Sequence, residues 1–239
     1  MKECKKYLFL IWLCFVMPFN LSYAQEIEMP VDTIYFSEIH DTLNYVYKNP
    51  LKFVGSEDMN MGFLKFYEEI LGLIKGTYLD DLKLQDIDDN FIQLSSLDKP
   101  IFFHVTASWC APCQSEKPAL KDLVEKYHDK VVFISVFWDG PKGVNKIRDG
   151  YHDEMILIPS RIKQKGPNEA IIPGFRHVLG FPFTFYVDAD REIKEVTLGG
   201  SVVGSFPGKD GGMITYTEED VYGNVTQAFE KGISLILKE

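Results

Sequence analysis

The sequence has little cysteine, little positive charge and no internal repeat, and each shortage excludes a class of protein. Only four of the 239 residues are cysteines, too few for a disulfide framework. Twenty-five lysines and arginines oppose 35 aspartates and glutamates, for a net charge of −10, so nucleic acid is not an expected partner. With no repeats and 46% hydrophobic residues, the composition is that of an ordinary globular protein, neither a solenoid nor disordered.

Long hydrophobic runs are also missing, except at the N-terminus. Three lysines lie within the first six residues, an apolar run covers residues 7–17, and Ser22 and Ala24 are small. This pattern is typical of a signal peptide, here cleaved after Ala24. An uncleaved membrane anchor is the alternative, but the run is shorter than the ~20 residues that a spanning helix needs. The pattern predicts export to the periplasm or cell envelope.

Cleavage would change the cysteine content. Cys4 and Cys14 lie in residues 1–24, so Cys110 and Cys113 would be the only cysteines left. A disulfide across two residues constrains the unfolded chain very little, so it contributes little stability. A single CxxC in an exported protein therefore indicates redox chemistry. A zinc site would need a second pair, so no metal is expected.

Residues 81–239 predict an α/β domain with a mixed central sheet flanked by helices. Continuous apolar runs predict buried strands at 101–106 and 131–137, and a helix is expected from just after Trp109 to about residue 127. The remaining expectations are short strands at 82–84 and 91–94, one helix plus loop over 140–175, a β-hairpin over 183–198, a glycine-rich loop over 199–213 and a closing helix over 217–237.

Residues 25–80 form an N-terminal extension whose one clear pattern is helical. Apolar residues recur through 61–75 at the spacing of a helix with a broad buried face, ending near Gly76. We expect this helix to pack against the main domain, and partner binding is the alternative.

The chemistry is expected where a buried strand runs into Cys110-Ala111-Pro112-Cys113. A helix that starts here places Cys110 at its N-terminus, where free N–H groups and the helix dipole stabilise a thiolate. Cys113, three residues on, lies on the same face and is close enough for a disulfide. Pro112 falls in the first turn, where its missing N–H is not needed.

The motif Trp109-Cys110-Ala111-Pro112-Cys113, followed by Glu116, Pro118 and the segment 180–184 (GFPFT), resembles the active-site pattern of the thioredoxin superfamily. The flanking pattern is most similar to the periplasmic TlpA/ResA-like branch, over residues 80–239. The resemblance implies a thioredoxin-like fold and a thiol–disulfide oxidoreductase without a cofactor. The partners of such an enzyme would be substrate proteins with disulfides or thiols and a membrane or periplasmic thiol electron donor. The resemblance favours a reductase over an oxidant.

The resemblance also implies roles for single residues. Cys110 would be the nucleophile and Cys113 the resolving thiol. Pro182 matches a cis-proline beside the disulfide, and the backbone of Phe181 would pair with the substrate chain. Trp109 would shield the disulfide and offer a contact surface.

Two further residues are candidates for proton handling. Glu116 lies three residues beyond Cys113 and can share its face of the helix; the alternative is a solvated surface charge. His104 occupies the position where thioredoxins carry a buried aspartate, and it shares a strand face with Phe102 and Thr106. It could shuttle the Cys113 proton, or it could be a structural histidine of the core.

Two other functions compete with disulfide exchange. Copper-delivering relatives on this fold use two cysteines and a downstream histidine, here Cys110, Cys113 and His177, although their motif is CxxxC. A binding module that kept only the fold is the third hypothesis, and the intact CxxC motif argues against it.

Overall fold

The computed structural model describes residues 33–49, 59–167, 169–208 and 212–237. The signal peptide predicted over residues 1–24 lies outside the described residues. Within the described ranges, no helix is long and apolar enough to span a lipid bilayer.

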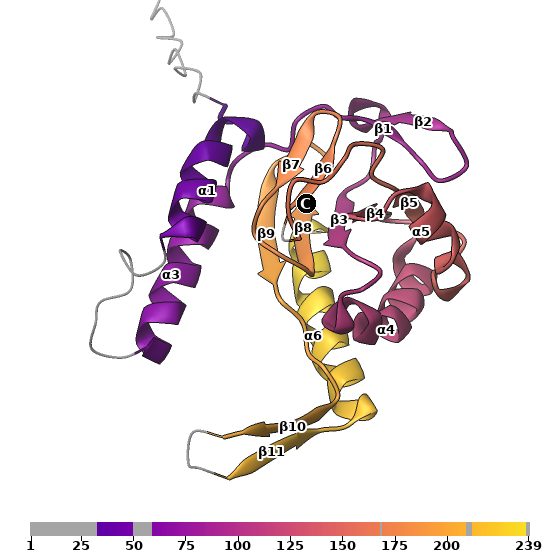
Figure 1. The fold of residues 1–239 in the computed structure, drawn as a ribbon. Helices are drawn as coiled ribbons and strands as arrows, with labels where there is room; N and C mark the ends of the chain where they lie inside the picture. The colour runs from indigo at the N-terminus through magenta and orange to yellow at the C-terminus, as the bar shows by residue number, and fades with distance from the viewer. Residues whose placement is uncertain (1–32, 50–58, 168, 209–211, 238–239) are drawn as a thin grey trace, which may run out of the picture. The chain divides into compact units, whose positions relative to one another are not determined.

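A five-stranded sheet in the order β5-β4-β3-β8-β9 forms the centre of the described chain (Figure 1). The strands β3 (Ile101–Thr106), β4 (Val132–Phe137) and β5 (Ile156–Ile158) run parallel. The strands β8 (Phe183–Val187) and β9 (Ile193–Leu198) are antiparallel to their neighbours. The mixed sheet predicted from the sequence is therefore confirmed.

Helices cover both faces of this sheet. Successive side chains of a strand point to opposite faces, so Phe103 packs with one hydrophobic cluster and Phe102 with the other. The Phe103 cluster includes residues of α1 (His40–Lys48) and α3 (Met59–Ile74). The Phe102 cluster includes residues of α4 (Ala111–Tyr127) and α6 (Glu218–Ile236), the helices beside the CxxC motif.

The described N-terminal elements pack against the sheet. A 3₁₀ helix, η1 (Phe36–Ile39), precedes α1. Ile70 and Ile74 of α3 are buried in the same cluster as Phe185 of β8. Just after α3, the Gly76 N–H donates a hydrogen bond to the carbonyl of Ile193, which ties this helix to the edge strand β9.

Both long helices beside the site begin as the sequence predicts. The helix α4 starts at Ala111 with Cys110 as its N-cap, and Pro118 lies inside it. The helix α6 begins after Thr217, whose hydroxyl accepts a hydrogen bond from the Asp220 N–H, while the Asp220 carboxylate accepts one from the Thr217 N–H. This reciprocal capping box satisfies backbone donors that a helix start leaves free.

The structure adds strands where helix and loop were expected. Residues 140–175 hold α5 (Pro141–Asn145), η3 (Arg148–Gly150), β5 and β6 (Ala170–Ile172), and β6 pairs with β7 (Phe175–His177). Elsewhere, β1 (Lys83–Gln85) and β2 (Phe91–Gln93) form the expected short strands, followed by η2 (Leu94–Ser96).

The prediction of a loop over residues 199–213 is wrong. The strands β10 (Gly204–Pro207) and β11 (Met213–Tyr216) form a separate antiparallel hairpin. Both strands are edges, and an edge strand accepts glycine and proline that a central strand would not. The glycines and Pro207 that indicated a loop are therefore compatible with strand structure here.

Candidate active site

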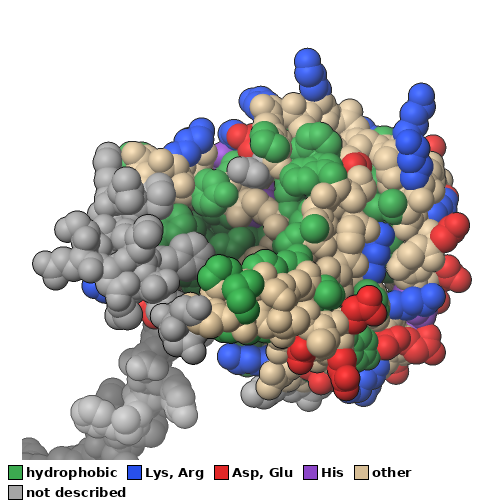
Figure 2. Space-filling model, turned by 60° about the horizontal axis from the view of Figure 1, so that its bottom comes forward, with side chains coloured by type: hydrophobic (Ala, Val, Ile, Leu, Met, Phe, Trp, Pro, Cys, Tyr) green, Lys and Arg blue, Asp and Glu red, His purple; other side chains and the backbone are tan. Residues whose placement is uncertain are grey.

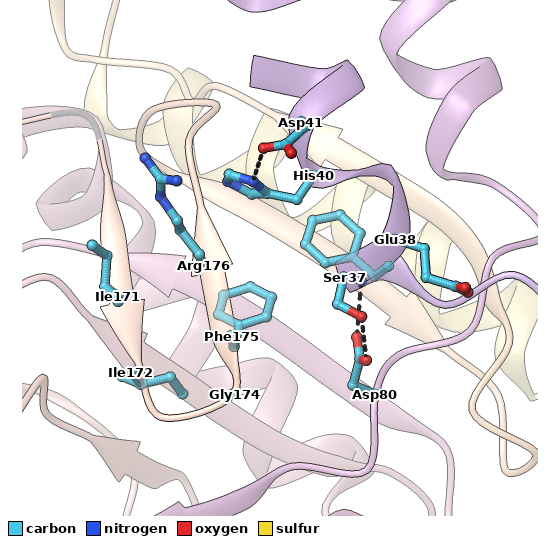
Figure 3. Close-up of a pocket in the computed structure, with 11 residues that line it drawn as sticks. Ser37, Glu38, His40, Asp41, Asp80, Ile171, Ile172, Gly174, Phe175 and Arg176 are labelled. Atoms are coloured by element: carbon cyan, nitrogen blue, oxygen red, sulfur yellow. Dashed lines mark hydrogen bonds and ion pairs between the residues drawn. The ribbon is translucent and has the colours of Figure 1, made fainter. Parts of the chain in front are cut away.

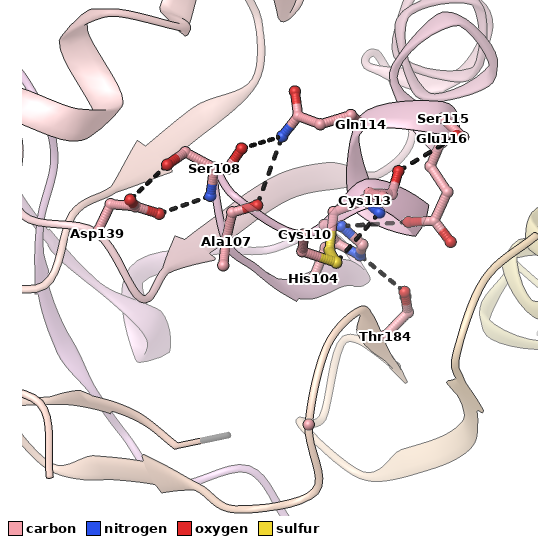
Figure 4. Close-up of a disulfide and its surroundings, with 12 residues drawn as sticks. His104, Ala107, Ser108, Cys110, Cys113, Gln114, Ser115, Glu116, Asp139 and Thr184 are labelled. Atoms are coloured by element: carbon pink, nitrogen blue, oxygen red, sulfur yellow. Dashed lines mark hydrogen bonds and ion pairs between the residues drawn. A yellow bond between two sulfur atoms is a disulfide. The ribbon is translucent and has the colours of Figure 1, made fainter. Parts of the chain in front are cut away.

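The two cysteines lie where β3 ends and α4 begins, and they form a disulfide with 5.2 Å between their Cα atoms (Figure 4). Cys110 is the N-cap of α4, and the Cys113 N–H donates a hydrogen bond to Cys110 Sγ at 3.3 Å. An N–H aimed at the sulfur and the positive end of the helix dipole both favour a thiolate at Cys110 once the disulfide is reduced. Cys110 is 5% exposed and Cys113 only 1%, so Cys110 is the sulfur nearer to solvent.

Aromatic residues surround the disulfide. Trp109 is 51% exposed, and its ring meets those of Trp138 and Phe181 edge-to-face, each at a centroid distance of 5.7 Å. The Trp138 indole N–H donates to the carbonyl of Gly166 at 2.9 Å. Trp138 and Phe181 also pack against the small buried cluster that contains both cysteines. Trp109 thus presents an open ring surface on a fixed aromatic base beside the redox pair.

A polar network holds the loop before Cys110. The Ser108 N–H and hydroxyl donate to the two carboxylate oxygens of Asp139, at 2.6 and 2.5 Å. The Gln114 amide donates to the carbonyl of Ser108 at 2.9 Å. Asp139 was not predicted from the sequence, although its place two residues after the buried strand β4 was a usable signal.

The proline segment lies against the same site. The Phe181–Pro182 peptide bond is cis, as the resemblance implied. Gly200, just after β9, comes so close that a Cβ there would lie 2.6 Å from Glu116 Oε1, 3.0 Å from Pro182 Cγ and 3.2 Å from Pro112 Cβ. A larger side chain at this position would force these neighbours to shift. This contact was not predicted because the residues are distant in sequence.

Glu116 is buried, with 1% of its surface exposed, so the alternative of a solvated charge on the helix surface is wrong. Its burial raises the pKa of the carboxyl well above the usual value. His104 is fully buried, and burial lowers its pKa to about 3. Burial thus makes Glu116 a weaker acid and His104 a weaker base than the free side chains.

The two side chains face each other beneath the helix start. His104 Nε2 lies 3.7 Å from Glu116 Oε2, and among the described residues neither atom has a hydrogen-bond partner. His104 Nδ1 is 2.9 Å from the hydroxyl of Thr184. Tyr151 and Tyr186 also face Glu116, and burial raises the pKa of both phenols, so they stay neutral. The arrangement places a buried carboxyl and a buried imidazole side by side, close to the redox pair.

His177, the histidine of the copper alternative, lies elsewhere in the core. Its Nε2 is 2.8 Å from the carbonyl of Gly180, and burial is the main cause that lowers its pKa to about 4. The described residues contain no group of three or more His, Cys, Asp or Glu side chains placed to hold a metal ion. The structure therefore brings Cys110 and Cys113 together without gathering His177 as a third ligand.

A separate pocket of about 450 Å³ lies between η1 and the β6–β7 hairpin (Figure 3). Polar residues there bond to one another: the Ser37 hydroxyl donates to Asp80 at 2.6 Å, and His40 lies 3.4 Å from Asp41. None of the residues predicted to take part in disulfide exchange lines this pocket.

Comparison with known proteins agrees with this geometry. The pattern of the AhpC/TSA family matches residues 76–196, half of the chain. The chain belongs to the AhpC/TSA family. Thioredoxin-like protein YneN of Bacillus subtilis is 24% identical over 148 residues, which cover 61% of this chain and 84% of YneN.

Two further similarities concern disulfide chemistry. Thiol-disulfide oxidoreductase ResA of Oceanobacillus iheyensis is 28% identical over 118 residues, which cover 48% of this chain and 58% of ResA. The crystal structure of a thio-disulfide isomerase from Thermus thermophilus superposes with a TM-score of 0.43 at 23% identity, covering 53% of this chain and 87% of that one. The family, the ResA relatives and the Cys110–Cys113 disulfide confirm the predicted fold and enzyme class, a thioredoxin-like thiol–disulfide oxidoreductase.

Proposed function

We propose that the chain is an exported thiol–disulfide oxidoreductase that reduces disulfides of substrate proteins through Cys110 and Cys113. The observation that carries this proposal is the disulfide at the start of α4, with the Cys113 N–H aimed at Cys110 Sγ. Export is supported by the lysine-rich start and the apolar run of residues 7–17. N-terminal sequencing of the protein from a cell-envelope fraction tests it: a start at Gln25 supports export with cleavage.

The exchange needs two thiol steps. The Cys110 thiolate attacks one sulfur of the substrate disulfide, forms a mixed disulfide and releases the other sulfur as a thiolate. The Cys113 thiolate then attacks Cys110 Sγ, which frees the second substrate thiol and closes the Cys110–Cys113 disulfide. Two electrons pass from the protein to the substrate, and the two protons lost by the cysteines are taken up by the substrate thiolates. Cys110 attacks first because it is nearer to solvent and lies at the helix N-terminus.

Glu116 and His104 manage the proton of Cys113 in this proposal. Cys113 is buried and must lose its proton before it can attack. Glu116 accepts this proton, since burial raises its pKa and so makes its carboxylate a stronger base. His104 Nε2, which lies 3.7 Å from Glu116 Oε2, assists the transfer. The pair holds the proton only until a substrate thiolate takes it up.

Trp109, Phe181 and Pro182 would form the surface that meets the substrate. Trp109 offers its exposed ring, and the backbone at Phe181 precedes the cis bond beside the redox pair. An extended substrate segment could pair with this backbone in the manner of a β-strand. Because the chain uses only its own thiols, a second thiol protein of the membrane or periplasm must reduce Cys110–Cys113 after each turnover, and no cofactor is required.

The reduction potential of the Cys110–Cys113 pair tests this function. Titration with glutathione or dithiothreitol can be followed through the fluorescence of Trp109, since this ring lies beside the disulfide. A potential near about −270 mV or lower supports a reductase, whereas a value near about −120 mV indicates an oxidant that installs disulfides. Absence of any two-electron transition would contradict the redox function itself.

A further inference from the structure

The β10–β11 hairpin, called the arm below, exposes an unusual amount of apolar surface. Val203 just before it and Phe206, Met213 and Ile214 within it are 51%, 40%, 64% and 47% exposed. In the described chain its two strands pair only with each other, so both outer edges keep free backbone groups. Exposed apolar side chains on unprotected edges are features that soluble proteins normally avoid unless they bind something.

The arm begins at the redox site. Gly200, which leads into it, packs against Pro112 and Pro182, the two prolines that flank the disulfide. An open pocket of about 490 Å³ at the base of the arm is lined by Gln114, Ser115 and Pro118 of α4, and by Val203 and the first turn of α6. Gln114 directly follows Cys113. The arm and this pocket therefore continue the surface on which disulfide exchange takes place.

The charge at the base of the arm has one sign. Glu218 and Glu219 in the first turn of α6 line the pocket, and no lysine or arginine is among its described lining residues. The whole chain carries a net charge of −10. Figure 2, which brings this end of the molecule forward, shows hydrophobic side chains around a hollow and acidic side chains gathered toward the lower right of the view. A partner with basic side chains would be attracted, whereas a second copy or an anionic membrane would be repelled.

We propose that the arm and its pocket dock an extended segment of the substrate protein that carries apolar and basic side chains next to its disulfide. This inference rests on the proposed disulfide exchange and defines its substrate class. The segment adds a strand to a free edge of the arm, where its apolar side chains cover Phe206 and Met213. Its lysine or arginine lies against Glu218 and Glu219. The disulfide of the segment then reaches Cys110.

The test uses the full chain, reduced with dithiothreitol and desalted, with three disulfide probes. Two are synthetic cystine peptides that share leucine and valine flanks, one carrying lysines and the other glutamates at the same positions. The third is 5,5′-dithiobis(2-nitrobenzoic acid), too small to reach from Cys110 to the arm. The second-order rate constant of oxidation is measured for each by Trp109 fluorescence or by the released thiol. The lysine peptide is expected to react about tenfold faster than the glutamate peptide.

The decisive variant is Phe206→Ser/Met213→Ser, which changes side chains that are already exposed. It should lower the rate constant for the lysine peptide about tenfold, because a few apolar side chains supply most of the binding energy of an interface. The rate constant for the small disulfide should change less than about twofold, since that probe does not use the arm. Glu218→Gln/Glu219→Gln should abolish the preference for lysine. Phe91→Ser is the matched control, because Phe91 is 63% exposed on another hairpin, and it should change none of the rates.

Three outcomes would overturn the docking proposal. The arm variant could react with the lysine peptide at the unaltered rate, or it could lose the same factor toward the small disulfide, which would place its effect on the redox pair. It could also convert a dimer to a monomer in sedimentation with unchanged peptide rates, which would make the arm a contact between copies. A native chain inert toward all three probes would contradict the redox function instead, so the two failures are distinguishable.

Discussion

His104 and His177 lie on opposite faces of the sheet, and both are fully buried histidines among aromatic rings. Burial lowers the pKa of each, to about 3 and about 4. The difference lies in what each ring faces. The ring of His104 faces the buried carboxyl of Glu116 next to the redox pair, whereas the ring of His177 bonds to the backbone carbonyl of Gly180. Burial alone makes a histidine a weak base, and a neighbouring acid can make it part of a proton-transfer site.

The comparison requires first that disulfide exchange takes place on the face of the sheet where His104 lies. Replacing Cys110 by serine should lower disulfide reduction at least about a thousandfold, since loss of a covalent nucleophile removes the reaction path. Turnover of a peptide disulfide with dithiothreitol as the reductant measures it. Cys113→Ser should instead accumulate a mixed disulfide, visible by mass spectrometry. A Cys110→Ser protein with full activity would show the assignment of the nucleophile to be wrong.

Glu116→Gln should have the next largest effect. The amide keeps the size of the side chain but cannot take up the Cys113 proton, so resolution of the mixed disulfide should slow about tenfold to a hundredfold at pH 7. Rapid-mixing kinetics of the second exchange step measure this rate. Glu125→Gln, in the same helix α4 but exposed, is the control and should react like the native protein. Equal rates in both variants would assign Glu116 a structural role.

The two histidines can be compared directly by the same substitution. His104→Asn should slow the second exchange step several-fold and alter its pH profile, because the partner that assists Glu116 in proton transfer is lost. His177→Asn should leave the pH profile unchanged, since its ring bonds to the backbone carbonyl of Gly180 and packs on Phe181 instead of facing a carboxyl. The comparison fails if the two variants change the profile alike.

The subtlest prediction concerns stability against pH. Between about pH 6.5 and pH 4 the unfolded chain protonates His177 while the folded chain does not, so acidification should destabilise the protein by up to about 1 kcal/mol per pH unit. The pair of His104 and Glu116 behaves differently. The lowered pKa of His104 makes acidification below about pH 6.5 destabilising, whereas the raised pKa of Glu116 makes a rise in pH above about 4.5 destabilising. The two contributions therefore oppose and partly cancel each other between these pH values.

Urea unfolding at several pH values tests this cancellation. His177→Asn should flatten the loss of stability below pH 6.5. Glu116→Gln should steepen it, because the His104 contribution is then no longer balanced. The raised pKa of Glu116 also means that its own contribution to stability falls as the pH rises above about 4.5, and Glu116→Gln should remove that contribution. Identical slopes in both variants would contradict the assigned directions of the pKa shifts.

Much of the fold follows from local sequence pattern. The apolar run 101–106 forms β3, and the Thr217 and Asp220 pair caps α6 as expected. The strands β6 and β7 were not predicted because they adjoin the Pro173-Gly174 pair, and proline and glycine indicated a loop there. The β10–β11 hairpin escaped because Pro207 and the glycines around it indicate a loop unless the strand is known to be an edge.

The residues of the site also fall into two groups, those that local sequence pattern predicts and those that it does not. The cysteines and Glu116 could be named from the sequence because their spacing along one helix brings them together. Pro182 could be named because the segment 180–184 resembles the pattern of the thioredoxin superfamily. The approach of Gly200 to Glu116, and the hold of Asp139 on Ser108, join segments more than thirty residues apart. Such contacts depend on the register of the sheet, which a single sequence does not fix.

The pairing of Gly204 with Tyr216 at the base of the arm has a practical consequence. Directly opposed residues of an antiparallel pair are about 5 Å apart, so the chain enters and leaves the hairpin at nearly one point. Such a hairpin can be replaced by another hairpin, or by a short glycine linker, without a change in the distance between β9 and α6. Grafting new hairpins at this joint offers a route to redirecting the enzyme toward chosen substrates.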